Sequence, residues 1–315
     1  MSGKVKKHIL IALLAIVIIY ILFTVYADYE LVIYSFGNYN WLTIPLLLFL
    51  TFLTHLSRFF RWSYYLRLLK INIKTSESLL IFFSSLIMAV TPGKLGEFVK
   101  SYSLKKHADI PLSVSSPIII AERITEFLSL LIITACGIFL YNFGILIVLT
   151  LLGLIGLILL LFSNQKFVQG FITILTKISF LKKYRPSIMG VFEKSNILLK
   201  PVPFINALII NTIGWIFEFY AFYIIIHSFN SDFSFLWASF IFAFSIVVGA
   251  ASMLPGGLGI TDGSLSYLLM HFNINNENAV AITIITRTVT LWFTILLGII
   301  FLLIYTRKFG KVYSK

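Results

Sequence analysis

The sequence predicts an all-α polytopic membrane protein with six full transmembrane helices and two re-entrant Pro-Gly hairpins, arranged as an inverted repeat. Three observations predict this fold: an apolar composition, long apolar runs at helical length, and the separation of basic from acidic residues. Of 315 residues, 59% are hydrophobic and 12% are charged, and the mean hydropathy is +0.98. A water-soluble domain carries far more polar residues, so that class is excluded.

The full spans follow from the length of the apolar runs. A bilayer core of about 30 Å takes about 20 apolar residues to cross as a helix. Six runs meet this requirement, at 9–27, 41–57, 117–141, 144–163, 203–229 and 279–305. Two more apolar stretches each lead into a Pro-Gly turn and a second short segment, which predicts hairpins at 78–106 and 235–272.

The formal net charge of +13 is explained by the positive-inside rule rather than by a nucleic-acid partner. Basic residues gather at both termini, after the second span and in the loop 164–202, whereas the segments 28–40, 230–234 and 273–278 contain no lysine or arginine. We therefore expect both termini in the cytosol and a location in the cell membrane. One alternative for residues 9–27 is a cleaved signal peptide ending at Val25-Tyr26-Ala27.

An internal repeat relates the two hairpins. The segments TPGKLGEFVKSYS and LPGGLGITDGSLS share Pro92 with Pro255, Gly93 with Gly256, Leu95 with Leu258, Gly96 with Gly259, Ser101 with Ser264 and Ser103 with Ser266. With one inserted residue, Arg123 aligns with Arg287. The predicted repeats are 1–142 and 143–315. Three full spans separate the hairpins, so the second copy is inverted, which is typical of transporters.

The Pro-Gly turns are candidate anion sites. Where a helix restarts after a turn, its free amides and positive dipole end suit a phosphate, and a lipid phosphate is the natural ligand. The alternative is that the glycines only permit the turn, while Glu97, Thr261 and Asp262 cap the new helices.

Charged residues within the apolar runs are the other candidates. A charge at the bilayer centre costs roughly 3 kcal/mol, so such residues face the protein interior and form pairs. One interpretation is a structural pair, Glu218–Arg287 or Glu126–Arg123. The other is that Arg123 and Arg287, one in each repeat, hold an anionic headgroup. The complete set of predicted binding residues is Pro92, Gly93, Gly96, Glu97, Glu122, Arg123, Glu126, Glu218, Pro255, Gly256, Gly257, Gly259, Asp262 and Arg287.

Catalytic, metal and cofactor sites are not expected. The chain lacks the common hydrolase, zinc-protease and P-loop motifs, and its five histidines show no metal-ligand spacing. One cysteine allows no disulfide framework. The loop 164–202 mixes apolar and basic residues, which suits either a helix lying on an anionic leaflet or a solvated linker.

The two hairpin motifs, the Ala121-Glu122-Arg123 stretch and Arg287 resemble the lysylphosphatidylglycerol synthase transmembrane-domain family, also called flippase-like domain proteins. The second hairpin carries aspartate at Asp262, where family members more often have glutamate. The resemblance implies movement of a lipid between leaflets. It does not imply lipid synthesis, because no soluble aminoacyltransferase or glycosyltransferase domain is recognisable.

We therefore expect a translocase or secondary transporter of an anionic, phosphate-bearing lipid, such as an anionic phospholipid or a polyprenyl phosphate, rather than an enzyme. Two alternatives stay open. One is a membrane-embedded lipid-modifying transferase, and the other is a non-transporting subunit that docks a separate soluble synthase or transferase. Self-association into a homo-oligomer is compatible with all three.

Overall fold

The computed structural model describes residues 29–141, 146, 149, 150, 153, 156, 185–229 and 233–310. Every regular element in this part of the chain is helical, which confirms the all-α fold class. The spans predicted at 9–27 and 144–163 and most of the basic loop lie outside the described residues, apart from the few positions named.

Three described segments are long and apolar enough to cross a membrane: Trp41–Leu68, Pro201–His227 and Asn276–Phe309. They correspond to the spans predicted at 41–57, 203–229 and 279–305. The first contains a short 3-10 helix (Trp41–Thr43) and α3 (Ile44–Leu68), and the second is α11 (Pro201–His227). The third is α14 (Asn276–Arg287), a π-helical turn (Thr288–Trp292) and α15 (Phe293–Phe309). The run at 117–141 lies within α6 (Leu112–Tyr141), which begins earlier and contains Pro117.

The helix of the second span extends beyond the predicted residue 57. Helix α3 continues to Leu68 because a second set of side chains there is buried, including Trp62 at 0% and Tyr65 at 0% exposure. The arginines in this stretch lower its hydropathy, so hydropathy alone predicts a cytosolic loop. Arg61 is in fact 1% exposed within the helix.

The chain divides into two compact units. Unit 1 consists of residues 1–56, 83–97 and 214–315, and unit 2 of residues 57–82 and 98–213. Each unit draws segments from both halves of the sequence.

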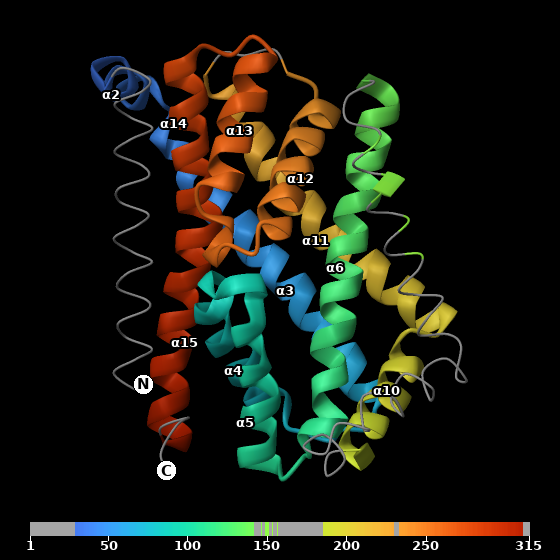
Figure 1. Cartoon of the computed structure of the whole chain (residues 1–315). Helices are drawn as coiled ribbons and strands as arrows, with labels where there is room; N and C mark the ends of the chain where they lie inside the picture. Colours follow the sequence, from blue (N-terminus) through green and yellow to red (C-terminus); the bar gives the residue numbers. More distant parts are fainter. Residues whose placement is uncertain are drawn as a thin grey trace. The chain divides into compact units, whose positions relative to one another are not determined.

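Unit 1 contains α2 (Tyr29–Asn38), α12 (Phe235–Ala251), α13 (Ile260–His271), α14 and α15. Helix α13 packs against both α12 and α14, and α14 also packs against α2 (Figure 1). Helix α15 packs against the 3-10 segment η2 (Leu86–Val90). Gly298 permits this contact, because a Cβ there would lie 2.3 Å from the backbone nitrogen of Ile87.

Unit 2 contains most of α4 (Thr75–Ser85), with α5 (Val99–Ala108), α6 and α10 (Arg185–Leu198). Helix α6 packs against α10 and α5. The first residues of α11 and the last residues of α3 belong to the same unit. The core of unit 2 therefore forms where α6 meets helices from distant parts of the sequence.

In both segments that were predicted to be hairpins, a Pro-Gly turn separates the helical elements before it from those after it. In the first, α4 and η2 lead into the turn and the segment Pro92–Phe98 leads out into α5. In the second, α12 is followed by a 3-10 turn (Pro255–Gly257) and α13. These bounds place the helix breaks where the sequence predicts them.

Candidate functional site

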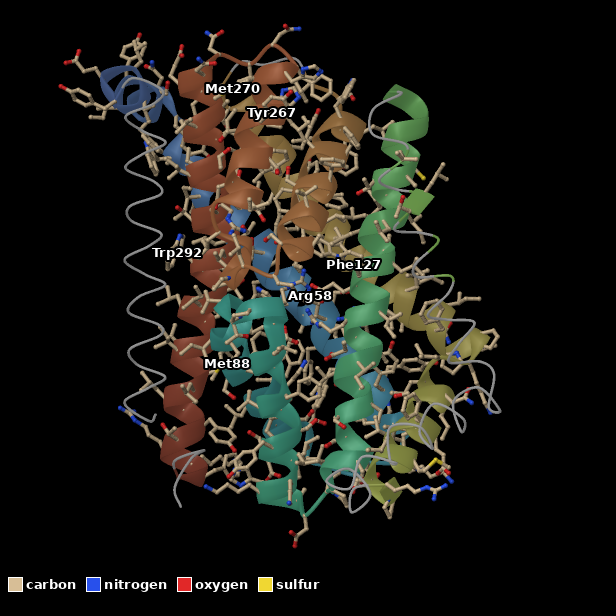
Figure 2. All side chains as sticks on the ribbon, viewed as in Figure 1. Arg58, Met88, Phe127, Tyr267, Met270 and Trp292 are labelled. Atoms are coloured by element: carbon tan, nitrogen blue, oxygen red, sulfur yellow. The ribbon has the colours of Figure 1, made fainter. Side chains whose placement is uncertain are left out.

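The two Pro-Gly turns lie against one another in unit 1. We call residues 91–97 the first tip and residues 252–259 the second tip. The second tip's 3-10 turn packs against η2, and a Cβ on Gly93 would lie 3.1 Å from Met253 Sδ. Figure 2 labels Met88 and Trp292, which mark η2 and the π-helical turn. The structure thus brings together two turns that are far apart in the sequence.

The backbone of both tips is non-helical. Gly93 and Lys94 have φ of 56° and 54°, and Gly256, Gly257 and Gly259 have φ of 63°, 66° and 79°. Glycine adopts this left-handed region without the steric cost that a Cβ imposes. Four of the glycines predicted in the binding set, Gly93, Gly256, Gly257 and Gly259, therefore suit the backbone of the turns themselves.

Thr91 closes the first tip. Its hydroxyl donates to the carbonyl of Met88 at 2.6 Å and accepts from the amide of Gly96 at 2.9 Å. Gly96 is pressed against this side chain, because a Cβ there would lie 2.7 Å from Thr91 Cγ2. Sequence reasoning missed Thr91, although threonine is a common capping residue at the start of a helix.

Asp262 and Arg287 close the second tip. Arg287 Nε lies 2.7 Å from Asp262 Oδ1, and Arg287 Nη2 donates to the carbonyl of Gly256 at 2.6 Å. Asp262 Oδ2 accepts from the amide of Gly259 at 2.8 Å, so the carboxylate caps α13, which was the alternative to an anion site. The ion partner of Arg287 is Asp262 and not Glu218, which lies buried on α11.

Small residues let α12 and α13 approach closely beside this tip. Thr261 is 2% exposed, and a Cβ added to Gly249 or Gly257 would lie 1.8 Å or 2.4 Å from its hydroxyl. Neither glycine can gain a side chain unless Thr261 moves. The ion pair and this contact together fix the start of α13.

A second polar cluster lies in the core of unit 2. Lys100 Nζ lies 2.5 Å from Glu122 Oε2, and the two side chains are 2% and 1% exposed. The ammonium group also lies 5.1 Å from the ring centroid of Trp62 and 5.3 Å from that of Phe82. Aromatic faces attract cations, so the pair is held between α5, α6, α3 and α4.

The third ion pair joins Arg123 to Glu126 on α6. Arg123 Nη2 lies 2.7 Å from Glu126 Oε2, one helical turn away, with the side chains 29% and 6% exposed. This is the Glu126–Arg123 pair that the sequence offered as one alternative. Both predicted arginines are therefore paired with carboxylates.

Arg61 completes the cluster in unit 2. Its Nη1 donates to Asn211 Oδ1 and, at 3.3 Å, to Thr125 Oγ1. Asn211 Nδ2 in turn donates to Ser129 Oγ at 2.9 Å. Among the described residues no carboxylate lies within ion-pair distance of Arg61.

Sequence reasoning missed Arg61, Lys100 and Asn211. Arg61 follows the predicted end of its span, although it lies among aromatic residues with Tyr65 one helical turn further on, the spacing of a buried helical face. Nothing in the sequence distinguished Lys100 from the neighbouring lysines Lys105 and Lys106.

The predicted binding residues fall into two separate groups. Unit 1 holds the tip residues together with Glu97, Glu218, Asp262 and Arg287, whereas unit 2 holds Glu122, Arg123 and Glu126. In the described part of the chain, no group of three or more histidine, cysteine, aspartate or glutamate residues could hold a metal ion. Unit 1 contains the buried cation Arg287 and non-helical backbone at the tips, and unit 2 contains the part-buried cation Arg123, and such cations are ligands for anions.

The chain matches one protein family and is similar in sequence to several membrane proteins. Residues 9–298 match the family described as Lysylphosphatidylglycerol synthase TM region. The UPF0104 membrane protein MJ1078 of Methanocaldococcus jannaschii is 29% identical over 240 residues, which cover 71% of this chain and 96% of that protein. A UPF0104 membrane protein of Methanothermobacter thermautotrophicus is 23% identical over 270 residues, covering 76% of this chain and 78% of that protein. The family match covers most of the chain, and the protein belongs to the lysylphosphatidylglycerol synthase transmembrane-region family.

Proposed function

We propose that the protein moves an anionic, phosphate-bearing lipid or amphiphile between the leaflets of the cell membrane, as a flippase-like translocase or a secondary transporter. The observation that carries the proposal is the meeting of two helix-breaking Pro-Gly tips in unit 1, beside the buried Asp262–Arg287 pair. Family membership agrees with this role.

Broken helices in a membrane protein have a functional explanation. Non-helical backbone at membrane depth is tolerated only where protein shields it or where it lines a polar cavity. Transporters place such breaks near their binding sites, with helix termini directed at charged substrate groups. The tips carry large exposed side chains, since Leu95 is 66% and Met253 65% exposed, so the tip surface is open to a ligand.

The topology that belongs to this proposal has six full spans and two re-entrant hairpins, in inverted repeats at 1–142 and 143–315. Both termini and the basic loop 164–202 are cytosolic. The support is the distribution of lysine and arginine along the chain and the similar Pro-Gly turn in each hairpin.

Buried charge in apolar helices supports an ionic substrate. The span Asn276–Phe309 contains an 18-residue window of mean hydropathy 2.3, and the same span carries Arg287 at 4% exposure. A buried ion pair contributes little net stability, since desolvation offsets its attraction. Its presence beside a helix break is better explained by a tip that changes partners during transport.

The proposal is tested with purified protein in liposomes that carry labelled phosphatidylglycerol, polyprenyl phosphate or phosphatidylcholine. We expect exchange of the anionic lipids above the rate of protein-free vesicles, and a loss of exchange in Arg287→Gln. Arg307→Gln is the matched control, because that arginine lies exposed in the last turn of α15. Wild-type protein that exchanges none of these lipids would contradict the proposal.

A deletion strain separates the alternatives. A lipid product that is missing altogether indicates a transferase, whereas a product that accumulates in one leaflet indicates a translocase. Co-purification of one soluble synthase, with no exchange in liposomes, indicates a docking subunit.

A further inference from the structure

The buried cluster of unit 2 has one more cation than it neutralises. Lys100 pairs with Glu122 and Arg123 pairs with Glu126, which leaves Arg61 with only neutral hydrogen-bond partners among the described residues. We infer that unit 2 binds a phosphate group at Arg61. This site extends the proposed function, and it depends on that function only in the assumption that the ligand bears a phosphate group.

One edge of the Arg61 guanidinium is free. Both of its hydrogen bonds leave from Nη1, and its buried Nε has no hydrogen-bond partner among the described residues. Nε and Nη2 together form the edge of the planar group that binds two oxygens of one phosphate. The orientation of Arg61 therefore leaves its bidentate edge without a hydrogen-bond partner among the described residues.

Arg61 cannot remove its own charge. A buried lysine can lose a proton, but arginine stays protonated in proteins. An isolated buried charge is costly, and at 1% exposure Arg61 has no bulk water to solvate it. Glu122 and Glu126 attract it from a distance without contacting it. A bound anion supplies the missing counter-charge.

The neighbouring ion pairs make the position suitable for an anion. Lys100 neutralises Glu122 and Arg123 neutralises Glu126, so neither carboxylate repels a phosphate at full strength. One oxygen of Glu122 has no hydrogen-bond partner among the described residues, so this carboxylate can accept from a protonated phosphate or a headgroup hydroxyl. Asn211 holds the guanidinium through Nη1, away from the open edge.

The depth of Arg61 suits a headgroup. Seven residues separate it from Leu68 at the end of α3, which is about 10 Å at 1.5 Å per residue. Arg67, Lys70 and Lys74 lie around that end and attract anionic lipid. A phospholipid can therefore bring its phosphate to Arg61 while its chains stay in the bilayer.

The test is anion binding by the full-length protein in detergent and in nanodiscs. Native mass spectrometry counts phosphatidylglycerol molecules retained, against phosphatidylcholine, and a thermal shift measures stabilisation by inorganic phosphate. We expect wild-type protein and Arg307→Gln, whose arginine is exposed on α15, to retain phosphatidylglycerol. Arg61→Gln should bind about tenfold or more weakly, since a charge-assisted hydrogen bond is lost. Arg61→Lys should fall between them, because lysine keeps the charge but not the bidentate edge.

The two arms distinguish the source of the phosphate. If inorganic phosphate stabilises the protein but phosphatidylglycerol is not retained, the site binds a free anion. If phosphatidylglycerol is retained but inorganic phosphate does not stabilise the protein, the site binds a lipid headgroup. Both results support the inference. Wild-type protein that binds neither overturns it, as does Arg61→Gln binding as tightly as wild type. If Arg61→Gln does not fold, the wild-type and Arg61→Lys measurements decide.

Failure of the proposed function would be recognised separately. Binding does not require leaflet exchange. If the protein binds phosphatidylglycerol at Arg61 but does not move it, the phosphate site is supported and the translocase role is not. If the protein moves lipid but binds it equally well without Arg61, the translocase role is supported and the phosphate site at Arg61 is not.

Discussion

Arg287 lies 2.7 Å from Asp262, and the same carboxylate accepts a hydrogen bond from the amide of Gly259. One side chain thus caps α13 and neutralises a cation on α14. Because Arg287 also donates to the carbonyl of Gly256, the pair connects both sides of the second tip. The conformation of this turn depends on a buried charge pair as well as on its glycines.

Replacing Asp262 by asparagine should destabilise the protein strongly. Asparagine can still accept from Gly259, but Arg287 would be left as an unpaired buried charge, which costs about 3–5 kcal/mol. Thermal unfolding in detergent measures the change. Asp109→Asn is the control, since Asp109 is exposed and asparagine tolerates its left-handed backbone. Equal melting temperatures for wild type and D262N would argue against the pair.

Gly298→Ala should separate α15 from η2. The added Cβ would lie 2.3 Å from Ile87 N and 2.9 Å from Ile87 Cα, and backbone atoms cannot move aside as a flexible side chain can. We expect a loss of about 1–3 kcal/mol in stability, the usual cost of overpacking. Gly37→Ala is the matched control, since a Cβ there meets nothing within 4 Å. A G298A protein as stable as G37A would show that the contact is looser than described.

Lys100 and Glu122 should be strongly coupled. Either Lys100→Met or Glu122→Gln leaves the other charge buried without its partner, whereas the double variant removes both charges. We expect each single change to cost several kcal/mol and the double variant to be more stable than the sum predicts, with a coupling of about 0.5–3 kcal/mol. A double-mutant cycle in thermal unfolding measures it, and purely additive effects would contradict a direct pair.

Stability should fall in mild acid through His107 at the end of α5. Burial, and then Lys106, lower the pKa of His107 below 6.5, and Glu77 opposes this in part. The unfolded chain therefore binds a proton more readily than the folded one, so stability is lost as the pH falls through 6.5 and levels off below the folded pKa. Unfolding across this range measures the slope, and His107→Gln should reduce it. An unchanged slope in H107Q would assign the effect to other groups.

Much of the fold was predictable because its signals are local. Apolar runs predicted the helices, and the repeated Pro-Gly motif predicted where the helices break. The boundary of α3 was not predictable from hydropathy, because its end carries arginines whose burial depends on helices distant in sequence. In the candidate site, too, only the local features could be predicted. Asp262 was predictable as a cap, whereas its pairing with Arg287 and the contacts of Arg61 and Lys100 arise only from tertiary packing.

Leaflet exchange by wild-type protein tests the central claim most directly. Vesicles with fluorescent phosphatidylglycerol in both leaflets are treated with dithionite, which bleaches only the label that reaches the outer surface. The account predicts that vesicles containing the protein bleach beyond the plateau of protein-free vesicles, and that vesicles containing Arg287→Gln stop at that plateau. The account would be contradicted if vesicles containing wild-type protein bleached only to the plateau of protein-free vesicles, with labelled phosphatidylglycerol and with labelled polyprenyl phosphate.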